Sequence, residues 1–175
     1  SLTAFPLLVI GSGGNYTMDN SNSSTSLSFT ASATASSLAL GASNPALTVS
    51  GAVTINQPTA SVITSLNING GSVSVSGTIA FVGGSATAGR VGQIAITNGS
   101  LSVSGAVNFA SNTTDANQVI IITGSGSASF ASSVVTTAQA DLRDGTLSVT
   151  GSGSMSFTNK LTITGGTISV GSSAI

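Results

Sequence analysis

The nine residues Leu101-Ser-Val-Ser-Gly-Ala-Val-Asn-Phe109 decide the fold, because two closely similar phrases precede them in the chain. Residues 47–55 read Leu-Thr-Val-Ser-Gly-Ala-Val-Thr-Ile, and residues 73–81 read Val-Ser-Val-Ser-Gly-Thr-Ile-Ala-Phe. In each copy, apolar and polar residues alternate on both sides of a glycine, which is the pattern of two short β-strands joined by a turn. The sequence therefore predicts an all-β fold built from a repeated unit.

One apolar position recurs in this repeat, four residues after the glycine. Weaker copies of the phrase extend the series, although the steps between successive members vary from 18 to 28 residues. A second apolar pair lies upstream in several copies, as in Leu66-Asn-Ile68 and Ile94-Ala-Ile96, so each full repeat holds three short strands. We expect the recurring position to form one core ladder of Phe29, Ile55, Phe81, Phe109, Phe130, Phe157 and Ile175.

Two folds accommodate three short strands per repeat. In a parallel β-solenoid each coil lies on the previous one, about 4.8 Å away, so every position stacks on its equivalent. The alternative is an antiparallel β-sandwich of jelly-roll or pilin-like type, because Asn-Gly and Asp-Gly between alternating runs are strong hairpin signals. In an up-and-down sheet, however, three strands reverse the chain at each repeat, and equivalent positions do not meet. We therefore favour a parallel β-helix of about six to seven coils.

The domain organisation follows from where the repeat begins. We expect residues 1–175 to form a single all-β domain. Its repeat coils are expected over 27–175, after an N-terminal joining or capping segment over 1–26.

Two glycine-rich phrases carry a resemblance to known proteins. Asn69-Gly-Gly-Ser-Val-Ser-Val-Ser-Gly77 and Thr164-Gly-Gly-Thr-Ile-Ser-Val-Gly171 resemble the passenger domains of autotransporters and adhesins of the filamentous-haemagglutinin type. The similarity covers roughly residues 45–175. It implies a right-handed parallel β-helix that is secreted and exposed at the cell surface.

The composition excludes several kinds of chemistry. The chain has three basic and four acidic residues, and it lacks Glu, His, Cys and Trp, while Ser and Thr make up 57 of its 175 residues. Disulfides, Cys/His zinc sites and histidine acid–base catalysis are therefore absent, and so is the basic surface that nucleic-acid binding needs. The longest apolar run is seven residues, Ala4–Ile10, whereas a membrane span needs about 20. We expect neither an enzyme nor a protein with a cofactor, metal ion, nucleic acid or small-molecule substrate as its partner.

The most hydrophobic segment lies near the N-terminus and offers a route to self-assembly. Residues 2–10 can cap the first coil of their own chain, or add as a strand to a neighbouring copy. A head-to-tail contact that does not close produces a filament. We therefore expect an extracellular structural subunit that polymerises into a filament or surface layer, and the alternative is a monomeric adhesin or ice-binding module. The residues expected in the joining strand are Leu2, Phe5, Leu7, Leu8, Val9 and Ile10.

The remaining polar motifs suggest only weak candidates. Asp141, Arg143 and Asp144 form the one charge cluster, which we interpret as a surface ion pair beside an Asp-Gly turn. A calcium cage around Asp19 or Asp115 is a minor alternative. Threonines are too irregularly placed in the sequence to favour ice binding. Sequons in the expected loops make Asn15, Asn22 and Asn112 possible glycosylation sites.

Overall fold

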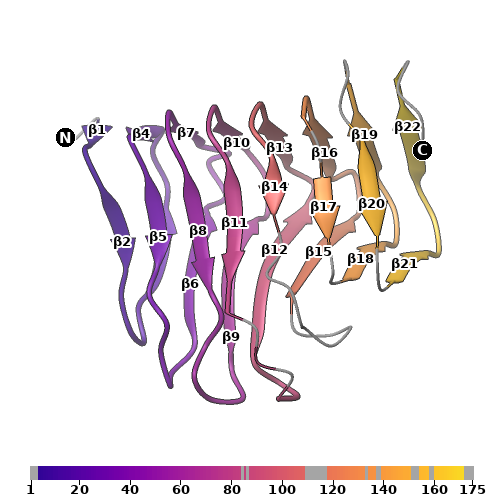
Figure 1. Ribbon diagram of the computed structural model, residues 1–175. Helices are drawn as coiled ribbons and strands as arrows, with labels where there is room; N and C mark the ends of the chain where they lie inside the picture. Colours follow the sequence, from indigo (N-terminus) through magenta and orange to yellow (C-terminus); the bar gives the residue numbers. More distant parts are fainter. Residues whose placement is uncertain are drawn as a thin grey trace.

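The chain folds into a parallel β-solenoid with three sheets (Figure 1). The computed structural model describes residues 4–83, 85, 87–108, 118–132, 134–136, 139–150, 154–157 and 160–171, and these residues contain strands but no helix. Each strand pairs in parallel with the strand three places later in the chain, so each coil contributes one strand to each sheet. This topology confirms the predicted solenoid, and it excludes the β-sandwich.

We call the three sheets A, B and C; among the described residues they contain eight, seven and seven strands. Sheet A consists of β1 (Ala4–Phe5), β4 (Asn22–Ser24), β7 (Ala46–Val49), β10 (Ser72–Val75), β13 (Ser100–Val103), β16 (Ser127–Phe130), β19 (Thr146–Val149) and β22 (Thr167–Val170). Sheet B consists of β2 (Leu8–Ile10), β5 (Leu27–Phe29), β8 (Val53–Asn56), β11 (Ile79–Val82), β14 (Val107–Asn108), β17 (Val134–Thr136) and β20 (Met155–Phe157). Sheet C consists of β3 (Asn15–Met18), β6 (Ser36–Leu40), β9 (Ile63–Ile68), β12 (Val91–Thr97), β15 (Gln118–Thr123), β18 (Gln139–Leu142) and β21 (Lys160–Ile163).

These strands make seven three-stranded coils, and β22 begins an eighth. The count slightly exceeds the predicted six to seven. Figure 1 shows the coils side by side from β1 to β22, with the two ends of the chain at opposite ends of the stack.

The alternation of apolar and polar residues in the sequence corresponds to side chains that point into and out of the solenoid. Every second residue of a strand points inward, and inward residues of successive coils stack in columns. In sheet C one such column begins with Met18 and continues through Leu40, Ile68, Ile96, Ile122, Leu142 and Ile163. Because the same column runs through all seven coils, a single apolar core extends along the axis of the solenoid.

The predicted core ladder is correct in part. Phe29, Ile55 and Phe81 are buried and stack directly on one another in sheet B. Phe157 lies in sheet B too, but Phe130 does not. It lies in sheet A, between Val103 and Val149. Phe109, Ile175 and the side chain of Phe157 lie outside the described residues.

The error at Phe130 came from two kinds of glycine that look alike in sequence. Gly51, Gly77 and Gly105 stack at the corner that follows sheet A. Gly126 instead lies at the corner that precedes sheet A, where it accepts a backbone hydrogen bond from Thr146 and the Ser127 N–H bonds to Gly99. Because Gly126 does not belong to the first group, the prediction that Phe130 lies in sheet B is wrong. The same difference explains why the step from Phe109 to Phe130 is only 21 residues.

The predicted boundary at residue 26 does not coincide with a change of architecture. The first coil is made of β1, β2 and β3, and β4 opens the second coil. Residues 4–26 thus belong to the solenoid itself. They lack the glycine-centred phrase, which is why the sequence pattern did not include them.

Candidate functional site

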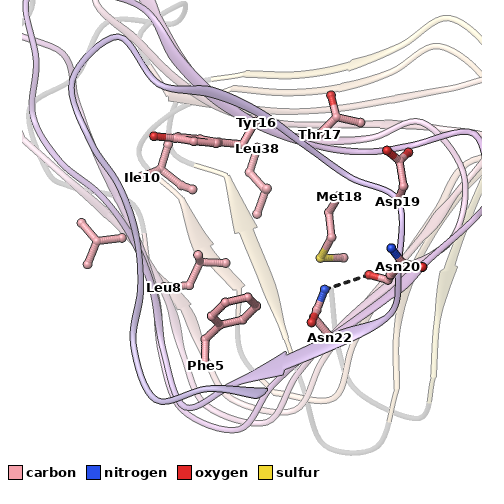
Figure 2. A pocket seen from close by; sticks show the side chains of 11 residues that line it. Phe5, Leu8, Ile10, Tyr16, Thr17, Met18, Asp19, Asn20, Asn22 and Leu38 are labelled. Carbon is pink, nitrogen blue, oxygen red and sulfur yellow. Dashed lines mark hydrogen bonds between the residues drawn. The ribbon is translucent and has the colours of Figure 1, made fainter. Parts of the chain in front are cut away.

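Among the residues that the structure describes, the first coil is open on the side that faces away from the solenoid. Within them, β1, β2 and β3 each have a neighbouring strand on one side only. The inward side chains of this coil enclose a hollow of about 490 Å³, into which Phe5, Leu8 and Met18 point (Figure 2). Tyr16 occupies an inward position in register with Leu38, yet it is 54% exposed, because no coil of the described residues lies on its outer side. An apolar cross-section of the core is therefore exposed at this end.

The open edge also presents backbone groups that lack a partner strand. The Leu8 N–H donates to the Ser26 carbonyl at 3.0 Å, and the Ile10 carbonyl accepts from the Thr30 N–H at 3.0 Å. Both groups point toward the second coil. Because successive backbone groups of a strand point in opposite directions, the N–H and C=O of Val9 face the open edge. Such an edge is a template for pairing with another chain.

The predicted joining strand divides into two parts in the structure. Leu8 and Ile10 pack against the core of their own solenoid, and Ile10 is buried. Leu7 and Val9 point outward and are 57% and 46% exposed. Phe5 lies in β1, half-buried, and Leu2 lies outside the described residues. Strand β2 is thus apolar on both faces, whereas an outer face exposed to water usually carries polar residues.

The opposite end of the solenoid presents the same cross-section. Strands β20, β21 and β22 are the last in their sheets among the described residues. Ile163 continues the inward column of Leu142 but is 53% exposed. The Thr164 N–H bonds back to Leu142 at 3.0 Å, so the backbone groups of Ile163 face outward along the axis. Both ends therefore combine exposed apolar side chains with an unpaired strand edge.

The outer surface of sheet A is coated with hydroxyl groups, which the sequence analysis did not anticipate. One outward column, in register from coil to coil, reads Ser23, Thr48, Ser74, Ser102, Ser129, Ser148 and Ser169. A second, parallel column reads Ala46, Ser72, Ser100, Ser127, Thr146 and Thr167. We call these two columns the hydroxyl face. The signal was present as the repeated Ser-x-Ser of the core phrase, but it becomes a surface only when the register is known.

Two of the charged residues, Asp141 and Arg143, form an ion pair. Arg143 donates to Asp141 Oδ2 from its Nη2 at 2.8 Å and from its Nε at 3.0 Å. The hydrogen bond with Asp141 and the charge of its carboxylate raise the pKa of Arg143 above its usual value. Asp144 lies in the turn before Gly145, as the sequence predicted.

The metal and glycan candidates fall at separate places. No group of three acidic, histidine or cysteine side chains that could hold a metal ion occurs among the described residues, and Asp115 lies outside them. Asn15 is exposed on β3 and accepts a hydrogen bond from Ser37. Asn22 lines the hollow, where its Nδ2 donates to the Asn20 carbonyl and its Oδ1 has no hydrogen-bond partner (Figure 2). Asn112 lies outside the described residues.

Comparison with known proteins found no family model, no curated protein and no solved structure that matches the chain. The part of the chain that the structure describes holds no helix with the length and apolar character that a bilayer crossing requires.

Proposed function

We propose that the protein is an extracellular structural subunit, without enzymatic activity, that assembles head to tail into a filament or surface layer. The observation that carries the proposal is the open first coil, with its hollow, its exposed Tyr16 and its unpaired edge. The sparsely charged composition supports self-assembly, since little net charge opposes association.

In this arrangement the last coil of one copy lies on the first coil of the next. The edge strands at both ends are parallel members of the same three sheets, so strand pairing can continue across the contact, although β22 extends sheet A by one strand beyond sheets B and C. In sheet C, the inward column that ends at Ile163 of one copy would continue with Met18 of the next copy. The contact between subunits would thus resemble the contact between successive coils, with apolar side chains stacked inside and strand edges paired in parallel.

The energetics favour assembly that depends on concentration. Full burial of an apolar side chain contributes roughly 1.5–3 kcal/mol, and only a few exposed side chains at each end gain it. Association costs about 4–15 kcal/mol in translational and rotational freedom. The hydrophobic gain alone is therefore marginal, and backbone pairing along three strand edges has to supply the remainder.

Replacing Val9 by proline tests this edge directly. The Val9 N–H faces the open edge, so proline removes a donor and places its ring against the neighbouring copy without breaking a hydrogen bond within the subunit. We expect the variant to remain folded and to raise the concentration needed for assembly at least tenfold, or about 1.4 kcal/mol. Sedimentation velocity and negative-stain electron microscopy measure assembly, while circular dichroism monitors the fold.

Val9→Thr is the matched control, since it keeps the N–H and the β-branched shape, and it should assemble like the unaltered protein. If Val9→Pro forms filaments at the same concentration as Val9→Thr, end-to-end pairing through β2 is wrong. If the unaltered protein is a monomer at all concentrations, a binding module of the adhesin type becomes the better proposal.

The fold should tolerate acid. The chain has four Asp and no Glu or His, so few groups titrate between pH 3 and pH 7. The raised pKa of Arg143 keeps its guanidinium charged throughout this pH range. We expect the melting temperature at pH 3 to lie within about 5 °C of that at pH 7. A cooperative loss of the β-sheet circular dichroism signal near pH 3 would contradict this expectation.

A further inference from the structure

The three outer faces of the solenoid differ in charge. The described residues include six with charged side chains, and all of them lie in a strand of sheet C or within two residues of one, although Asp144 is equally close to β19 of sheet A: Asp19, Arg90, Asp141, Arg143, Asp144 and Lys160. No described strand of sheet A or sheet B contains a charged residue. Sheet B carries a mixture of outward residues such as Val9, Thr54 and Ala80, whereas sheet A presents the hydroxyl face.

Several hydroxyl groups of this face are exposed and make no hydrogen bond to another described residue. The side chains of Thr48, Ser74, Ser102 and Ser169 are exposed. No hydrogen bond joins the hydroxyl groups of these four residues to another group of the described residues. Two members of the same column are exceptions: Ser148 bonds to the Ala128 carbonyl at 3.3 Å, and Ser23 also has an interaction partner. The hydroxyl groups of the four exposed residues are therefore free to bond to whatever lies against the face.

A face of this kind is complementary to itself. A hydroxyl group both donates and accepts hydrogen bonds, so two such faces satisfy each other, whereas two faces of lysine or aspartate repel. Both copies also carry the same coil spacing of about 4.8 Å, so hydroxyl groups that meet in one coil meet in every coil. Identical stacked strands use this self-matching in the interfaces between paired β-sheets.

We propose that the hydroxyl face is a lateral interface, and that its partner is the hydroxyl face of a second copy. The face measures about 30 by 13 Å, or roughly 400 Å² per copy. Pairing two copies buries roughly 800 Å² in total, less than the 1,200–2,000 Å² of a stable complex. A single pair of subunits is therefore held weakly, but a filament places many faces in a row and strengthens the contact by avidity. This lateral pairing rests on the proposed head-to-tail assembly for its strength.

Single cysteines test the face, because the chain contains none of its own. Ser74→Cys places a thiol on the hydroxyl face, and Ala80→Cys places one on the outer surface of sheet B in the same coil. A flexible bismaleimide that spans about two coil steps tolerates a shift in register between faces. Equivalent residues of head-to-tail neighbours are about seven coils apart, so a cross-linked dimer reports lateral contact only.

We expect Ser74→Cys to give at least about fivefold more cross-linked dimer than Ala80→Cys at equal concentration, a ratio that corresponds to roughly 1 kcal/mol. Equal yields from the two positions would overturn the lateral interface, whether or not filaments form. Preferential cross-linking at Ser74→Cys in a protein that forms no filaments would support the lateral interface and contradict head-to-tail assembly. Filaments with equal yields would support head-to-tail assembly and contradict the lateral interface.

Discussion

Replacing Phe29 by alanine is expected to lower the free energy of unfolding by about 3–5 kcal/mol. The side chain is 0% exposed and lies between Ile10 and Ile55 in the inward column of sheet B. Its removal leaves a cavity between two coils that are held by backbone hydrogen bonds on three sides, so the site cannot collapse freely. Urea unfolding followed by circular dichroism measures the loss as a lower midpoint at an unchanged slope.

Ser28→Ala is the matched control, because Ser28 precedes Phe29 in the same strand but points outward. A substitution there should change the free energy of unfolding by about 0.5 kcal/mol or less. Similar losses for the two variants would mean that the inside and outside of β5 are assigned wrongly.

Replacing Gly77 by alanine is expected to cost about 3 kcal/mol, for a different reason. A Cβ atom on Gly77 would lie 2.5 Å from the Gly51 carbonyl oxygen and 2.6 Å from the Gly51 carbonyl carbon. Both are backbone atoms of the preceding coil, so no change of rotamer relieves the overlap. The two coils have to move apart at this corner, which weakens the adjacent hydrogen bond from the Gly77 N–H to the Gly51 carbonyl, now 3.2 Å.

Gly11 offers the control for this prediction. A Cβ atom there would meet no other atom within 4 Å, so Gly11→Ala should be neutral or stabilise the fold by up to about 1 kcal/mol. A Gly77→Ala protein that unfolds at the same urea concentration as Gly11→Ala would contradict the close stacking of coils at the glycine corner.

The sequence predicted the features that depend on local alternation. The runs Leu47–Val49, Val73–Val75, Leu101–Val103, Leu147–Val149 and Ile168–Val170 all fall in sheet A, in register with one another. Alternation identified them because the inward residues face the same core; they are buried in the first four runs, and Ile168 and Val170 are partly buried at the end of the solenoid. Steric stacking also explains the conspicuous glycine in the core phrase, since a side chain at Gly77 or Gly105 would overlap the backbone of the coil before it.

Features that depend on how strands of different coils are aligned could not be predicted from the local alternation of residues. Phe130 was placed in the wrong sheet because Gly126 resembles the corner glycines of the other group, and only the pairing of Phe130 with Val103 resolves it. The repeat coils were predicted to begin only at residue 27, because Leu8 and Ile10 have no glycine phrase around them, although they pack against the same core. The hydroxyl face required the outward positions of several distant coils to be aligned.

The candidate site was predicted in its location but not in its form. The apolar segment around Leu8 and Ile10 was expected either to cap its own first coil or to join a neighbouring copy as an added strand. The structure places these residues in the first coil, where their inward side chains complete the core. What remains available to a partner is the open edge at Val9 and the hollow beside Tyr16, and neither is visible until the coil has formed.

Fibre diffraction from aligned assemblies of the full chain tests the central claim most directly. Head-to-tail stacking continues the coil spacing from one subunit to the next, so we predict a strong reflection at about 4.8 Å along the filament axis. Filaments whose reflection at about 4.8 Å lies perpendicular to the axis, or a protein that remains monomeric at high concentration, would contradict the account.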